Sequence, residues 1–82
     1  MVDRNNGEVT FTIHEILGVI CENNDGWMRE VTITSWNGGP PKIDIRYWSP
    51  DHERMTRGLT FFEDEAEKLA QILSERYGTD RR

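Results

Sequence analysis

The chain has 82 residues, a formal net charge of −5 and one cysteine. A domain of this size buries only roughly 60–65% of the surface that its unfolded chain exposes, so a disulfide, a metal or a second subunit usually supports it. Cys21 alone excludes an internal disulfide, and His14 and His52 lack ligand spacing, so we expect no metal or other cofactor. A homodimer is the remaining means of support.

No run approaches the roughly 20 apolar residues of a membrane-spanning helix, and residues 1–7 lack the features of a signal peptide. The sequence therefore predicts a cytoplasmic protein without a membrane partner. Its charge is uneven, because residues 26–58 carry five basic and four acidic side chains. A local patch governs anion binding, so this segment is a candidate for contact with nucleic acid. A mixed-charge solvated surface is the simpler interpretation.

The chain reads as a tail at residues 1–7, one domain at 8–78 and a second tail at 79–82. Alternating apolar and polar residues predict strands at 8–14 and 16–22, with a bulge at Gly18. Residues 23–26 are rich in Asn, Asp and Gly, which predicts a turn.

Two longer strands are predicted at 27–36 and 42–48, on either side of the strand-breaking residues 37–41. Residues 49–60 predict a polar connector. An apolar stripe at helical spacing predicts a helix over 63–77 that ends at Gly78, with capping-box spacing between Thr60 and Glu63. The predicted fold is α+β: a four-stranded antiparallel meander followed by one C-terminal amphipathic helix, in a homodimer.

Strict alternation gives such a sheet an aliphatic face, which must meet the helix or a second subunit. If the two longer strands pair around Gly39, Trp36 lies opposite Lys42, and Trp48 shares its face. A slip of two residues keeps this grouping. The other face therefore presents two indole rings, basic side chains and threonines to solvent.

This combination favours binding of single-stranded nucleic acid. Exposed rings stack on bases, at about 1–3 kcal/mol per base, and cations between them hold phosphates. In the opposing interpretation, Trp36 and Trp48 cap the core or fill a dimer seam. Trp27 has the other parity, so we expect it at the edge of the core or in a seam, with a third stacking platform as the alternative.

The remaining candidates lie in the connector. Arg54 and Arg57 either fold over a bound strand or remain solvated. Residues 51–53 combine two acids with His52, but no nucleophile or phosphate-binding loop accompanies them, so they read as a solvated turn. We expect no catalytic residue and no enzymatic activity.

The run Asp44-Ile45-Arg46-Tyr47-Trp48, followed by Pro50-Asp51 and then Gly58-Leu59-Thr60, resembles the bacterial YdbC-like branch of the transcriptional positive cofactor 4 (p15) family. The resemblance covers residues 8 to 75. It implies a homodimer of β-β-β-β-α subunits that binds single-stranded DNA on curved sheets, as a coactivator-like, nucleoid-associated protein. Single-stranded RNA is an alternative, because stacking does not distinguish the sugar. A dimeric protein-interaction module anchored by tryptophans is another.

The resemblance also implies roles for particular residues. Trp36 and Trp48 occupy the positions that stack on bases. Phosphate contacts are implied for Arg29, Lys42, Arg46, Arg54 and Arg57, with a salt bridge to Asp44 as an alternative for Arg46. Trp27, Asn37 and Thr34 are further candidates. At the usual helix cap this chain has Phe62, so we expect the helix to begin at Thr60 or to start less firmly.

Overall fold

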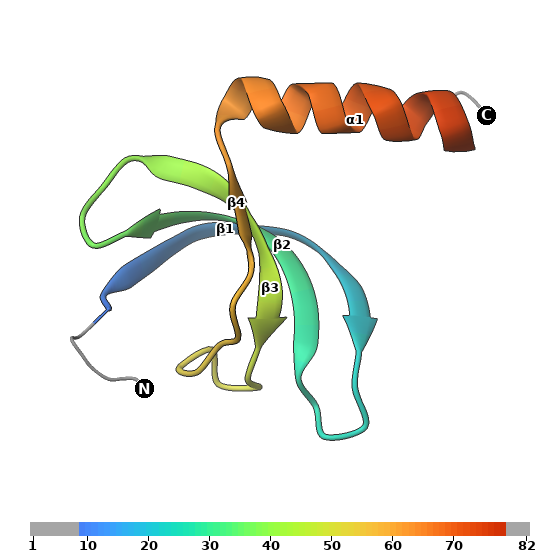
Figure 1. The fold of residues 1–82 in the computed structure, drawn as a ribbon. Coiled ribbons are helices and arrows are strands. Elements are labelled where there is room, and N and C mark those ends of the chain that lie inside the picture. Colours follow the sequence, from blue (N-terminus) through green and yellow to red (C-terminus); the bar gives the residue numbers. More distant parts are fainter. Residues whose placement is uncertain (1–8, 79–82) are drawn as a thin grey trace.

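The computed structural model describes residues 9–78, so the tails expected at 1–7 and 79–82 lie outside the described part of the chain. The elements are β1 (Phe11–Glu22), β2 (Met28–Trp36), β3 (Pro41–Trp48), β4 (Leu59–Phe61) and α1 (Glu63–Tyr77). The strands form one antiparallel sheet in the order β1-β2-β3-β4 (Figure 1). The predicted α+β class, an antiparallel four-stranded sheet followed by one C-terminal helix, is therefore confirmed for the single subunit. Within residues 9–78, no helix is long and apolar enough to cross a membrane.

The individual strands differ from the prediction at both ends of the sheet. The segments expected as two strands at 8–14 and 16–22 form the single strand β1, which bends at three register shifts against β2. One shift falls between Ile16 and Gly18, where a bulge was predicted. The fourth strand is β4, which was expected to be connector and which pairs with Ile43–Ile45 of β3.

The β2–β3 hairpin pairs two residues away from the predicted register, so Thr34 lies opposite Lys42 and Thr32 opposite Asp44. The cause is the turn, where Asn37 and Gly38 both have positive φ and the Gly39 N–H donates to the Trp36 carbonyl (2.9 Å). Asn-Gly is the preferred pair for such a hairpin turn. Because the slip is two residues, the side chains keep the predicted grouping by face.

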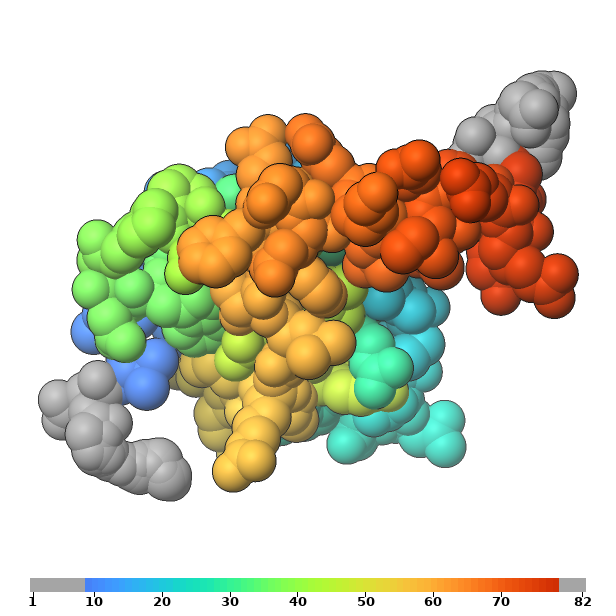
Figure 2. Space-filling model, turned by 45° about the horizontal axis from the view of Figure 1, so that its top comes forward, coloured from blue at the N-terminus to red at the C-terminus, as the bar shows by residue number. Residues whose placement is uncertain are grey.

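The sheet curls around its polar face, and this reverses the expected burial. Glu30, Thr32, Thr34 and Asp44 are buried, although the polar face was expected to be in water. Large apolar side chains are instead at least 47% exposed at Leu17, Val19, Ile20, Leu59, Ile72 and Leu73. The described part measures 44 × 32 × 17 Å, and α1 lies along one rim rather than over a sheet face (Figures 1 and 2).

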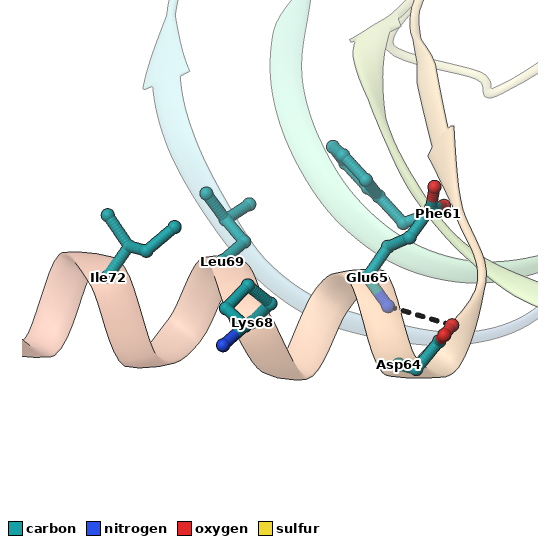
Figure 3. A pocket seen from close by; sticks show the side chains of 6 residues that line it. All are labelled: Phe61, Asp64, Glu65, Lys68, Leu69 and Ile72. Atoms are coloured by element: carbon teal, nitrogen blue, oxygen red, sulfur yellow. Dashed lines mark hydrogen bonds between the residues drawn. The ribbon is translucent and has the colours of Figure 1, made fainter.

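The helix has the predicted bounds and ends at Gly78, whose N–H donates to the Ser74 carbonyl. Its start differs from the predicted capping box. The Glu65 carboxylate accepts the Phe62 N–H at 2.9 Å, so the cap lies two residues later, while Thr60 bonds to Asp44 in the sheet. Leu69 and Ile72 project from α1 toward the side of Phe61 and border an open groove there (Figure 3).

Candidate nucleic-acid interface

Three aromatic rings gather on the inner side of the curl, and we call Phe11, Trp36 and Trp48 the aromatic cluster. The two indoles are nearly parallel, with an interplanar angle of 11° and ring centroids 6.1 Å apart. The Phe11 ring lies 5.0 Å from Trp48 and 5.7 Å from Trp36. Trp48 pairs with Met28, which lies eight residues before Trp36 in β2. In a flat strand, Met28 and Trp36 would be about 26 Å apart. The contact between the indoles therefore requires the curl.

The cluster corrects the expectation that both indoles stand in water. Trp48 is 0% exposed, whereas Trp36 is partly exposed. The indole Nε1 atoms of both are buried and have no hydrogen-bond partner within the described residues. A buried donor without an acceptor costs about 1–3 kcal/mol. Phe11 belongs to an alternating apolar segment that was expected on the aliphatic face, and this is wrong because Phe11 pairs with Trp36 in the β1–β2 ladder and so shares the face of the indoles.

A guanidinium group lies over the Trp36 ring. The Arg46 Cζ is 4.3 Å from the ring centroid, a distance typical of cation–π contact. The Nε and Nη2 of Arg46 each donate to the Asp44 carboxylate at 2.7 Å, and the Thr60 hydroxyl donates to the same carboxylate at 3.1 Å. Asp44 is fully buried and the Arg46 side chain is 13% exposed. The salt bridge considered for Arg46 is therefore present.

Residues 49–58, which we call the connector, follow β3 and pass close over it. A Cβ at Gly58 would collide with the Ile45 carbonyl oxygen and the Arg46 Cβ, so only glycine fits this approach. The Thr56 N–H donates to the Tyr47 carbonyl at 3.1 Å. The connector therefore covers the backbone that carries Arg46.

The turn that begins the connector is built by its own polar groups. Asp51 accepts the Ser49 hydroxyl at 2.7 Å and the Glu53 N–H at 3.0 Å, and the first of these bonds is the main reason that the pKa of Asp51 lies below its ordinary value. His52 is not simply solvated, because its Nε2 donates to both oxygens of the buried Glu30 carboxylate at 2.9 and 3.0 Å. This hydrogen bonding satisfies a buried carboxylate on the inner face.

Three of the predicted basic residues meet in one groove. Arg29 of β2, Arg46 of β3 and Arg57 of the connector line a groove of about 400 Å³. Ile45, Tyr47, Gly58 and Leu59 complete the lining, so within the described part of the chain no acidic side chain borders it. The Arg29 guanidinium lies 4.5 Å from the centroid of the Tyr47 ring. Tyr47 was not predicted as a site residue; its position beside Arg29 follows from the observed register, in which the two residues pair.

The Tyr47 hydroxyl contacts the Cys21 thiol at 3.3 Å. This bond is the main reason that the pKa of Tyr47 is raised, and Arg29 acts against it. The phenol therefore stays neutral beside the arginines of the groove at physiological pH.

The other predicted residues are spread around this site. Lys42 lies over the Phe62 ring at 4.6 Å, near the start of α1, and Arg54 lies over Trp27 at 5.7 Å. The Asn37 Oδ1 accepts the Thr10 N–H at 3.0 Å. The Thr34 side chain is fully buried, and its hydroxyl forms a hydrogen bond of 2.7 Å with the Thr32 hydroxyl. The prediction that Thr34 is a further candidate for contact with nucleic acid is therefore wrong for this structure.

Comparison with known proteins places this chain in a family. The model of the family described as Transcriptional Coactivator p15 (PC4) matches residues 23–72, from the β1–β2 turn into α1. An uncharacterized protein of Treponema pallidum (strain Nichols) is 35% identical over 69 residues, which cover 84% of this chain and 81% of that protein. The family is nucleic-acid-binding and non-enzymatic, and binds single-stranded DNA in general. The chain belongs to the Transcriptional Coactivator p15 (PC4) family.

Proposed function

We propose that this protein binds single-stranded DNA with little sequence preference, holding phosphates in the arginine-lined groove and stacking a base on Trp36. The observation that carries the proposal is the groove itself, where Arg29, Arg46 and Arg57 come together from three segments. Guanidinium groups bind phosphate oxygens through paired N–H donors. Because Arg46 also lies over Trp36, the groove adjoins a partly exposed indole ring of the aromatic cluster.

In this proposal the two tryptophans have different tasks. Trp36 provides the stacking surface, and Trp48 supports it from within the subunit, because a ring that is 0% exposed cannot meet a base unless the cluster opens. Arg54 and the partly exposed Trp27 form a second cation–π pair at the other end of β2, where they can extend the contact. Lys42 supplies a further positive charge near the hairpin. No residue is assigned a catalytic role.

We further propose that the protein acts as a homodimer. Apolar side chains of β1, β4 and α1 are exposed in the single subunit, including Ile20, Leu59 and Leu73. Covering such surface removes it from water at about 25 cal/mol per Å². A second copy of the chain presents the same surfaces, so a symmetric pair covers both sets at once.

Binding is tested by fluorescence anisotropy with labelled oligothymidylate, a matched single-stranded RNA and a duplex, at two salt concentrations. We expect the single-stranded DNA to bind most tightly, with an affinity that falls as salt rises because counterions are released. Arg29→Ala and Arg57→Ala should each reduce the salt dependence. No binding of any nucleic acid at low salt would overturn the proposal and favour a protein-interaction module.

A further inference from the structure

We propose that Asp44 and Thr60 are positioning residues that hold the Arg46 guanidinium as a cap on Trp36, and that a DNA base binds by displacing this cap. The inference rests on the proposed function, and it concerns how the same site is opened. Its starting point is geometric, because a planar guanidinium 4.3 Å above an indole ring occupies the position that a stacked base would take.

The cap is held firmly from the inside. Asp44 is fully buried, and it binds Arg46 through two bonds of 2.7 Å. The Thr60 hydroxyl fixes the same carboxylate from β4. Paired charge-assisted bonds of this length set the orientation of the guanidinium plane. In the free protein Arg46 is therefore held by Asp44, so Arg29 and Arg57 are the groove arginines that first meet phosphates, and Arg46 joins them only when the cap opens.

The cap is also covered from the outside by the connector. Gly58 approaches the Arg46 side chain so closely that no Cβ fits, and the Thr56 carbonyl accepts a long bond of 3.4 Å from Arg46 Nη1. The same connector carries Arg54 and Arg57, the basic residues proposed to meet phosphates. A strand that draws these arginines outward therefore moves the segment that covers Arg46. This couples phosphate contact to uncapping.

The closed arrangement leaves polar groups unsatisfied, which favours opening. The Nε1 atoms of Trp36 and Trp48 are buried without an acceptor in the described part of the chain. A bound strand brings phosphate and base oxygens, and these can accept from indole N–H groups. Opening the cap therefore gives Trp36 a free face and gives the donors of the cluster access to acceptors.

Nuclear magnetic resonance tests the cap directly, because an N–H above an indole face has an upfield ring-current shift. We expect the Arg46 Nε–H signal to have this shift in the free protein and to lose it when oligothymidylate saturates the site. A ring-current shift that persists in the saturated complex would overturn the cap. Anisotropy of the labelled oligonucleotide, measured on the same sample, reports binding independently. Absence of any binding would overturn the proposed function and the gating together.

Stopped-flow association tests the two positioning residues. Asp44→Asn keeps the shape of the side chain but weakens its hold on Arg46, so we expect association to be about five- to tenfold faster. Glu30→Gln is the matched control, since Glu30 is the other buried carboxylate of the inner face and bonds to His52 rather than to Arg46. Equal rates in the two variants would contradict the proposal.

A milder variant keeps the test informative if Asp44→Asn does not fold. Thr60→Val removes only the hydroxyl bond to Asp44, and we expect about a twofold faster association together with a smaller ring-current shift of Arg46 in the free protein. The direction of the rate change separates positioning from a loss of stability, because partial unfolding would slow binding rather than speed it. An unchanged association rate in folded Thr60→Val would exclude a positioning role for Thr60.

Discussion

Trp36 and Trp48 carry the same ring but lie at different depths, so their removal should have different consequences. Trp36 is partly exposed at the edge of the curl, and Trp48 is 0% exposed between Phe11, Trp36 and His52. At the scale of single residues, burial therefore separates the proposed binding role of Trp36 from the folding role expected of Trp48. The neighbouring sequence does not separate them, because both indoles belong to the same predicted face.

Replacing Trp36 by alanine should weaken binding of single-stranded DNA by about ten- to a hundredfold while the protein stays folded, because one base loses its stacking partner. Trp48→Ala should instead lower the free energy of unfolding by about 3–5 kcal/mol, as expected for a large ring removed from a core. Anisotropy titration and urea unfolding of both variants measure the two effects. Equal unfolding midpoints for the two variants would show that Trp48 is not core.

Asp51 gives a prediction about pH. Its pKa is lowered from 3.8, chiefly by the bond from the Ser49 hydroxyl and then by the Glu53 N–H. A carboxyl group whose folded pKa is depressed stabilises the fold above its unfolded pKa, and this contribution is lost as the pH falls through the folded value. The connector should therefore be most stable at neutral pH and should loosen in acid below pH 3.8.

The comparison with Asp51→Asn isolates this effect from the other carboxyl groups. We expect the variant to be less stable than the natural protein at neutral pH, and the difference in urea midpoint to shrink as the pH falls below 3.8. A difference that stays constant across this range would mean that the ionised form of Asp51 does not support the turn.

At the scale of elements, the connector depends on one glycine. Gly58→Ala places a methyl group against the Ile45 carbonyl oxygen and the Arg46 Cβ, so β3 and the connector must separate. We expect a loss of about 1–3 kcal/mol in the free energy of unfolding, the usual cost of overpacking. Gly18→Ala is the matched control, because nothing lies within 4 Å of the added Cβ. Thermal unfolding of both variants should show a clear fall only for Gly58→Ala.

The elements also show how far the sequence could predict this fold. The helix over 63–77 followed from a regular apolar stripe and Gly78, and both are local signals. The strand Leu59–Phe61 was missed because it is short and forms only through its pairing with β3. The hairpin register was two residues off because the turn was centred on Gly39 rather than on Asn37 and Gly38.

The sequence predicted several residues of the candidate site, but it did not predict how they pack against one another. Alternation correctly grouped Trp36, Arg46 and Trp48 on one face, since parity survives a slip of two residues. It could not show that the sheet curls until two distant indoles touch, because curvature comes from the bulges of β1 and the close approach of Gly58. Parity therefore predicted which side chains share a face, while their burial depended on the shape of the whole sheet.

At the scale of the whole molecule, the unusual feature is an apolar exterior around a polar interior. The buried side chains of residues 9–78 include Glu30, Asp44 and two threonines, and Trp48 is the one fully buried hydrophobic residue among them. Most of the hydrophobic driving force is therefore unused in a single subunit. A thin sheet with a helix on its rim gains stability when a second subunit covers the exposed aliphatic side chains.

Charge on this surface should consequently separate the subunits of the proposed homodimer. Leu73→Asp puts a carboxylate on an apolar part of α1 that is 47% exposed in the single subunit, and burying an unpaired charge in an interface is costly. We expect analytical ultracentrifugation to show a dimer for the natural protein and a monomer for this variant, with a lower unfolding midpoint. Gln71→Asp is the control, because it adds the same charge at another exposed position of the helix. If both variants keep the mass of the natural protein, α1 does not contribute to a subunit contact, and the exposed aliphatic face must be covered in another way.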